Sequence, residues 1–126
     1  MPSITVANVQ AMDQSPYIAP SIIENMIVDL KRTGRLEGHY GAPAEHMDAL
    51  DAMARALYAK YGKQVSQSAL IAAAERFDTS PRVPHHVFVA LTAALSAGKE
   101  AQLGAAAQAM DAIHAMVVAL WALAPK

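Results

Sequence analysis

The sequence contains no cysteine, and this absence excludes three kinds of chemistry at once. Disulfide bridges, thiolate metal sites and a cysteine nucleophile are all ruled out, and a reducing cytoplasm suits such a composition. The first residues also lack the basic and then apolar pattern of a secretory signal. We therefore expect an intracellular, cytoplasmic protein.

Aromatic residues and net charge are scarce as well. Only 6% of the residues are aromatic although 54% are hydrophobic, because Ala, Met, Leu and Ile supply most of the apolar mass. These residue types favour helix, and Ala-rich helices can pack with their axes close together. Ten Lys plus Arg against eleven Asp plus Glu give a formal charge of -1, so no global field attracts nucleic acid or an anionic membrane.

Catalytic motifs are missing too. The sequence has no glycine-rich phosphate loop, no GxSxG nucleophile elbow and no HExxH metal motif. Where paired carboxylates do occur near a histidine, they belong to the solvent-exposed face of a predicted helix, which explains their positions without catalysis. We therefore expect no catalytic residues, no cofactor and no enzymatic activity.

What the sequence does have is an apolar C-terminal stretch, residues 102–124, which we predict to be the helix around which the rest of the chain packs. Its apolar side chains cover two adjacent helical faces. The first face holds Leu103, Ala107, Met110, Ile113, Val117, Leu120 and Ala124, and the second holds Ala105, Ala109, Ala112, Met116 and Leu123. Such a helix is buried in a bundle, shared between subunits or inserted in a membrane. An Asp and a His near its middle argue against a membrane span.

Four earlier segments have helical patterns. The first is 21–33, which opens with a capping box of Ser21 and Glu24 and ends at Gly34. The second is 43–61, with Pro43 at its first position, an Asp51–Arg55 pair and Gly62 as its C-cap. The third is 66–77, capped by Ser66, and the fourth is 84–97, with Pro84 at its first position. Residues 1–20 show no helical period. We expect them to form an irregular arm with Ile4, Val6 and Val9 extended and a turn at 13–16.

The predicted fold is therefore all-α. It is a single bundle of about five mostly antiparallel helices over residues 21–126, with residues 1–20 as an N-terminal arm and an apolar C-terminal helix. The last two helices should form a hairpin, because the connection between them is short. The C-terminal helix should pack on its neighbour and on the first two helices of the bundle.

Two kinds of site are weighed against purely structural roles. Five histidines suggest a metal, but only Asp111 and His114 have a helical ligand spacing, and two ligands are too few for zinc. The segment 43–77 has the lengths of a helix-turn-helix. Its DNA-reading residues would be Lys63, Gln64, Ser66, Gln67 and Arg76. The run Ala72–Ala74 leaves the reading helix few donors, so nucleic acid is not favoured.

By elimination the sequence favours a non-catalytic protein-protein interaction or assembly module. The partner is a second copy, forming a homodimer, or another protein, and not a membrane. Because one bundle core uses only one of the two apolar faces, the last helix should also carry self-association, through Met110, Ile113, Val117, Leu120 and Trp121. A DNA-binding regulator is the first alternative, and a bundle that binds a metal or a small apolar ligand is the second.

Overall fold

The computed structural model describes residues 3–13, 18–38, 40–78, 83–99 and 103–125. Over these ranges the chain forms six α-helices and one short 3-10 helix, with no strand. The prediction of an all-helical bundle is confirmed, with six helices where about five were expected. The additional helix lies in the N-terminal arm.

This additional helix, α1 (Val6–Met12), corrects the prediction of an extended segment there. Thr5 and Asn8 form a capping box in which each side-chain oxygen accepts the other residue's backbone N–H, both at 3.1 Å. Val9 is fully buried, and α1 packs on α3 and α2. Tertiary packing and a good cap thus stabilise a helix too short to show a period. The predicted turn falls mostly on residues outside the described ranges.

Helix α2 (Pro20–Thr33) begins one residue earlier than predicted. Pro20 takes the first helical position, which suits its fixed φ, so Ser21 lies inside the helix and the predicted Ser21–Glu24 capping box is wrong. The inward face is as expected. It consists of Ile23, Met26, Ile27 and Leu30. Gly34 closes the helix with a φ of 71°, the left-handed region that glycine adopts readily.

Helix α3 (Pro43–Tyr61) starts at Pro43 as predicted and carries the expected pair, with Arg55 Nε 3.1 Å from Asp51 Oδ2. Gly62 follows it as C-cap with a right-handed φ of −58° and leads into the 3-10 helix η1 (Gly62–Gln64). Helix α4 (Gln67–Phe77) then begins at its predicted cap. There the hydroxyl of Ser66 accepts the backbone N–H of Ala69 at 3.1 Å.

The last two helices are α5 (His85–Ala97) and α6 (Ala106–Leu123). Pro84 is the N-cap of α5 and not its first residue, a difference of one position. Helix α6 starts later than the predicted residue 102, because Gly104 takes a left-handed φ of 84° just before it.

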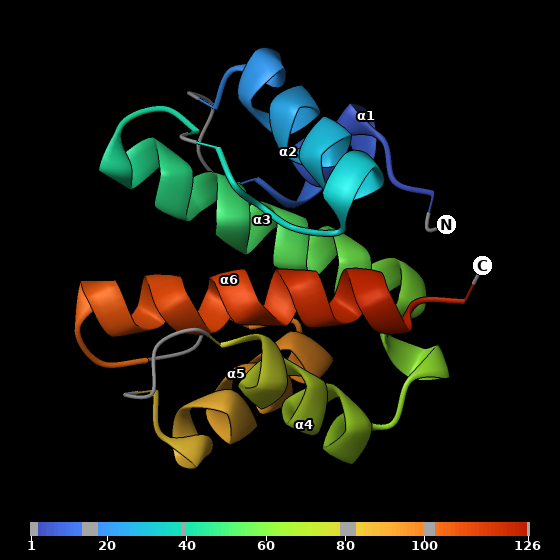
Figure 1. The fold of residues 1–126 in the computed structure, drawn as a ribbon, viewed down its shortest axis with the longest axis vertical. Coiled ribbons are helices and arrows are strands. Elements are labelled where there is room, and N and C mark those ends of the chain that lie inside the picture. The colour runs from blue at the N-terminus through green and yellow to red at the C-terminus, as the bar shows by residue number, and fades with distance from the viewer. Residues whose placement is uncertain (1–2, 14–17, 39, 79–82, 100–102, 126) are drawn as a thin grey trace.

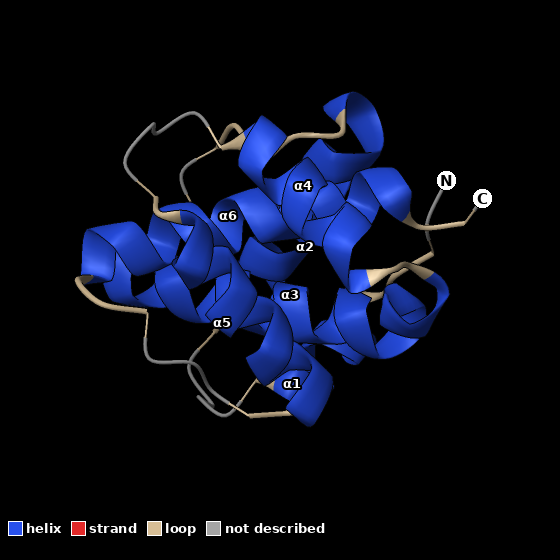
Figure 2. Ribbon diagram, turned by 90° about the horizontal axis from the view of Figure 1, so that it is seen from below, coloured by secondary structure: helices blue, strands red, loops and turns tan. Residues whose placement is uncertain are grey.

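The helices stack in three layers (Figure 1). Helices α3 and α6 lie side by side in the middle and run in the same direction, α1 and α2 cover α3, and α4 and α5 lie on the other side of α6. The view from below shows α4 and α5 in front of α6 (Figure 2). As predicted, α6 packs on its neighbour α5 and on α3, but the predicted packing on α2 is wrong, because α3 lies between α2 and α6. Helix α6 also packs more extensively on α4 than on α5.

This central position buries α6 on both of its apolar faces. Every residue from Ala112 to Trp121 is buried except His114, which is partly exposed. Met116, Val117, Ala119 and Leu120 are completely inaccessible to solvent. The second face of α6 is therefore covered within one chain, by its own neighbouring helices.

Candidate functional site

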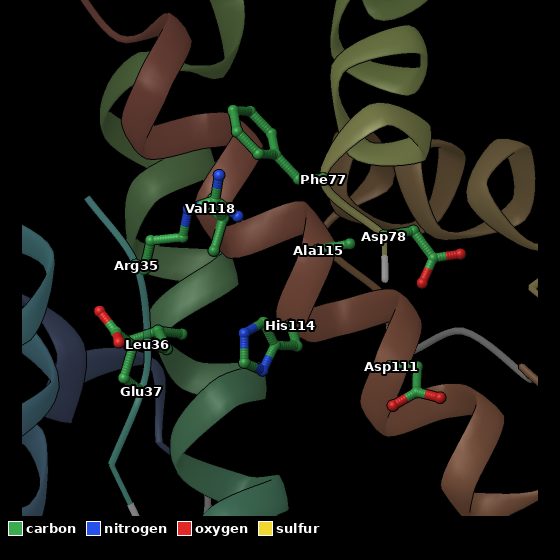
Figure 3. Close-up of a pocket in the computed structure, with 9 residues that line it drawn as sticks. All are labelled: Arg35, Leu36, Glu37, Phe77, Asp78, Asp111, His114, Ala115 and Val118. Atoms are coloured by element: carbon green, nitrogen blue, oxygen red, sulfur yellow. The ribbon is translucent and has the colours of Figure 1, made fainter. Parts of the chain in front are cut away.

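A polar cleft lies where three distant segments meet at α6 (Figure 3). Its volume is about 350 Å³, within the usual range of small-molecule pockets. The segments are the connection between α2 and α3, the end of α4, and one face of α6. The lining residues are Arg35, Leu36, Glu37, Phe77, Asp78, Asp111, His114, Ala115 and Val118.

The floor of this cleft is apolar and its walls are charged. Leu36, Ala115 and Val118 are buried. On one wall the guanidinium of Arg35 lies over the ring of Phe77, with its central carbon 5.1 Å from the ring centroid. This cation–π contact holds the flat guanidinium in place while its N–H edges stay available.

His114 stands between walls of opposite charge. In Figure 3, Arg35 and Glu37 lie to one side of the imidazole, and Asp78 and Asp111 lie to the other. Burial lowers the pKa of His114 below its ordinary value of 6.5; the nearby His46 and Arg35 lower it further, and Asp111 opposes them. The imidazole is therefore neutral at pH 7.

The two metal candidates, Asp111 and His114, both line this cleft, one helical turn apart. The part of the chain that the structure describes holds no group of three or more His, Asp or Glu side chains placed to bind a metal ion. A zinc ion would find two ligands here and usually needs three or four from the protein. The cleft is therefore better interpreted as a site for an organic molecule.

The candidate DNA-reading residues separate into two places. Lys63, Gln64 and Gln67 are exposed around η1 and the start of α4, and the hydroxyl of Ser66 is occupied by its helix cap. Arg76 lies at the other end of α4, about 14 Å farther along the axis, with its guanidinium over Phe77. This arrangement adds no support to the prediction of a DNA-reading surface.

The five residues proposed for self-association lie in the interior of the single chain. Ile113, Val117, Leu120 and Trp121 are between 0% and 7% exposed, and Met110 is partly buried. A second copy could reach them only if helices of the first moved apart. A homodimer stays a prediction, but its contact surface must be sought elsewhere.

An alternative surface is the outer face of α5. The exposed side chains of this helix include no Lys, Arg, Asp or Glu: they are His85, His86, Val89, Ala90, Ala93, Ser96 and Ala97. Val89 is 43% exposed and is one of two large hydrophobic side chains at the described surface. The other, Val28 on α2, stands among charged neighbours, Glu24, Lys31 and Arg32. The α5 face has no such neighbours within its own helix.

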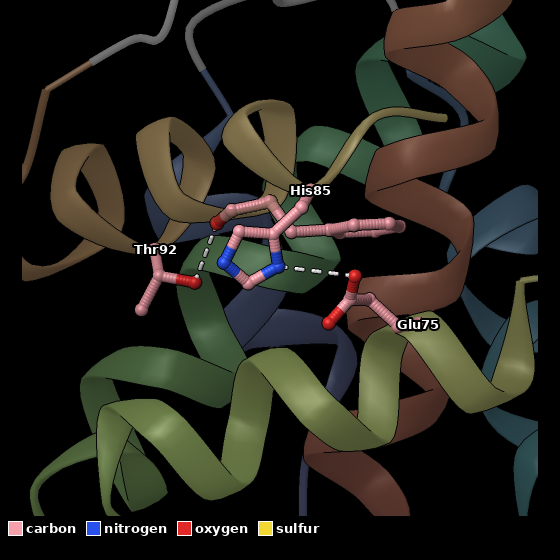
Figure 4. A network of polar contacts seen from close by, with 4 residues as sticks. Glu75, His85 and Thr92 are labelled. Atoms are coloured by element: carbon pink, nitrogen blue, oxygen red, sulfur yellow. Dashed lines mark hydrogen bonds and ion pairs between the residues drawn. The ribbon is translucent and has the colours of Figure 1, made fainter. Parts of the chain in front are cut away.

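One polar contact connects α5 to α4, and a second lies within α5 (Figure 4). The Nδ1 atom of His85 lies 3.1 Å from Oε2 of Glu75, and the buried hydroxyl of Thr92 donates to the Phe88 carbonyl at 2.8 Å. With Val87, Phe88 and Leu91 buried on the inner side, the outer face cannot rotate inward. Sequence reasoning missed this face, although the 16 residues between Arg82 and Lys99 contain no charged residue.

The cleft beside α6 and the outer face of α5 are interpreted from their own residues, because no protein-family model, curated protein or solved structure matches this chain. Among the helices that the structure describes, none combines the length and the hydropathy needed to cross a membrane.

Proposed function

We propose that this chain is a helical interaction and assembly module that pairs with a second copy of itself through the outer face of α5. The observation that supports this proposal is an exposed face of a 13-residue helix without Lys, Arg, Asp or Glu, whereas α2, α3, α4 and α6 each carry exposed charged side chains. Two identical faces of this kind can meet without like-charge repulsion and without stripping water from an ion.

Small side chains allow two such helices to approach closely. His86, Val89, Ala93 and Ala97 follow one another at intervals of three or four residues, so they form one stripe along α5. Alanine in the stripe permits a short distance between helix axes, near the lower end of the usual 8–10 Å. Val89 then gains the apolar cover that it lacks in the single chain.

An antiparallel arrangement about a two-fold axis fits the ends of the helix. With the axis between Ala90 and Ala93, Ala90 of one copy faces Ala93 of the other. Lys99, just beyond the C-terminus of one α5, then approaches the start of the other, where His85 contacts Glu75. Lys99 of one copy and Glu75 of the other are thus brought together with opposite sign.

One pair of helices buries little area, so the dimer should be weak and reversible. Stable interfaces usually bury about 1,200–2,000 Å² in total, and a single helix pair falls at or below the low end of that range. We expect a concentration-dependent equilibrium between monomer and dimer.

The decisive experiment measures mass against concentration by light scattering after size-exclusion chromatography. The parent should move from 13.4 kDa toward twice that mass as concentration rises. Ala93→Arg should remain a monomer, because two buried guanidinium groups would meet at the axis. The matched control is Ala72→Arg, an equally exposed alanine on the outer face of α4, which should behave as the parent.

A second measurement locates the contact without relying on loss of function. Because the chain has no cysteine, Ala93→Cys introduces a unique thiol. Under mild oxidation it should form a disulfide-linked dimer quickly, and Ala72→Cys should do so only slowly. A parent that stays monomeric up to millimolar concentration, or equal cross-linking of the two variants, would refute the proposal.

A further inference from the structure

The cleft beside α6 offers two opposite charges that the fold itself does not use. No hydrogen bond or ion pair connects the Arg35 guanidinium or the Asp111 carboxylate to another residue in the described ranges. Both side chains line the same cavity and lie on opposite sides of His114 (Figure 3). Each is also close enough to influence the ionisation of that imidazole.

The Arg35 end is suited to a carboxylate. Its guanidinium lies over the Phe77 ring, with the central carbon 5.1 Å from the ring centroid, and the group has a planar fork of N–H donors that can make two parallel hydrogen bonds. Because the stacking already orders this side chain, binding there costs less conformational entropy than at a free arginine.

The Asp111 end is suited to an ammonium group. Asp78 lines the same side of the cavity, so two carboxylates face this region. His114 between the two ends is neutral at pH 7 because its pKa lies below the ordinary 6.5. It therefore does not repel a cation, and it can act as a hydrogen-bond donor or acceptor.

The α6 side of the cleft gives its approximate length. Asp111, His114, Ala115 and Val118 lie on one face of α6, and seven residues of helix rise about 10 Å. Between the ends the floor is formed by apolar atoms of Leu36, Ala115 and Val118. A matching ligand has an alkyl chain over this floor and opposite charges at its two ends.

We infer that this cleft binds a linear amino acid whose ammonium and carboxylate groups stand at opposite ends of an alkyl chain. The carboxylate binds Arg35, the ammonium binds Asp111 with Asp78 nearby, and the methylenes cover the floor. An α-amino acid without a charged side chain places both charges on one carbon and cannot reach both ends. Glu37, next to Arg35 in the sequence, lines the same wall and weakens the attraction for the carboxylate.

The test uses a set of small molecules that differ in one feature each. The probe is 6-aminohexanoate, compared with hexanoate, hexylamine and glycine by isothermal titration calorimetry and by the NMR signals of the His114 ring. We expect 6-aminohexanoate to bind and to shift the His114 signals. Hexanoate and hexylamine should each bind at least about tenfold more weakly, since each lacks one charged hydrogen-bonding end. Glycine should not bind measurably.

Variants with matched controls assign the two ends. Arg35→Gln and Asp111→Asn should each weaken 6-aminohexanoate binding about tenfold or more, while Glu37→Gln should strengthen it. The controls are Arg32→Gln and Asp48→Asn, two exposed residues that do not line the cleft. All five positions are polar side chains at or near the surface, so circular dichroism should confirm unchanged folding.

Three results would overturn the inference. The first is absence of binding at millimolar 6-aminohexanoate. The second is equal binding of hexylamine or hexanoate, which would assign the cleft to a singly charged ligand. The third is an affinity that Arg35→Gln and Asp111→Asn leave unchanged, which would place the ligand at another site.

Discussion

Replacing Leu120 by Ala tests whether α6 is the centre of a core formed by one chain. The Leu120 side chain is completely buried, on a helix that packs against α3 and α4. Truncation removes the transfer free energy of the lost carbons and leaves a cavity, at a combined cost of about 3 to 5 kcal/mol. Since a domain of this size is stable by about 5 to 15 kcal/mol, the melting temperature should fall by about 15 °C.

The assay is urea denaturation followed by far-ultraviolet circular dichroism and by fluorescence of Trp121, the only tryptophan, which is 7% exposed. Leu123→Ala is the control, because it makes the same chemical change three residues later at a partly exposed position. It should cost about 1 kcal/mol.

Protein concentration provides the critical comparison. If the face of α6 that carries Leu120 were covered by a partner, unfolding would be coupled to dissociation, and the effect of Leu120→Ala would change with concentration. A core within one chain predicts the same loss at every concentration. Equal losses for Leu120→Ala and Leu123→Ala, or a loss that depends on concentration, would refute the reasoning.

Two further predictions concern pH and the N-terminal segment. Because folding lowers the pKa of His114, this imidazole is protonated in the unfolded chain at a higher pH than in the folded one. Stability should therefore fall as pH drops below about 6.5. In urea titrations, His114→Gln should remove this part of the pH dependence. The Tyr61 hydroxyl accepts the Ser3 N–H at 2.6 Å and donates to the Ser3 carbonyl at 3.0 Å, so Tyr61→Phe should destabilise the protein by about 1 to 2 kcal/mol. Amide exchange in α1 should accelerate in this variant, and unchanged exchange would contradict the role given to Tyr61.

Helix bodies were more predictable than helix starts. Gly34 and Gly98 end their helices in the left-handed region, with φ of 71° and 69°, because that conformation favours glycine wherever it occurs. The start of α2 was misplaced because two local signals compete there. Pro20 at the first helical position excludes Ser21 as the cap. The sequence pattern alone does not show whether the proline signal or the Ser21–Glu24 capping box is stronger.

The helix α1 shows the limit of periodicity as a signal. Its seven residues make about two turns, and only Val9 among them is buried, so no repeated apolar spacing can appear. The capping box does leave a trace in the sequence, but it joins Thr5 to Asn8, where the usual pattern has Glu or Gln at the second position. Stability here comes from packing on α3, which the local sequence does not encode.

The cleft was only partly visible in the sequence. The spacing of Asp111 and His114 marked one face of α6, whereas Arg35 and Phe77 belong to an interhelical connection and a helix end far away in the chain. These segments meet only because α6 lies between α3 and α4. In the sequence alone, Asp111 and His114 suggest a metal site. In the folded chain they form part of a cavity with an arginine on the opposite wall.

The same arrangement changes which helix should be examined for self-association. Apolar content pointed to α6, yet the three-layer packing covers both of its apolar faces. Helix α5 buries Val87, Phe88 and Leu91, but Val89 and Ala93 remain outside without charged neighbours on the helix. A helix face that only borders solvent gains solubility from outward charges, as α3 does with Asp48 and Lys60. The charge on the exposed face, and not the apolar content of the whole helix, therefore distinguishes a helix covered by its own chain from one suited to a second copy.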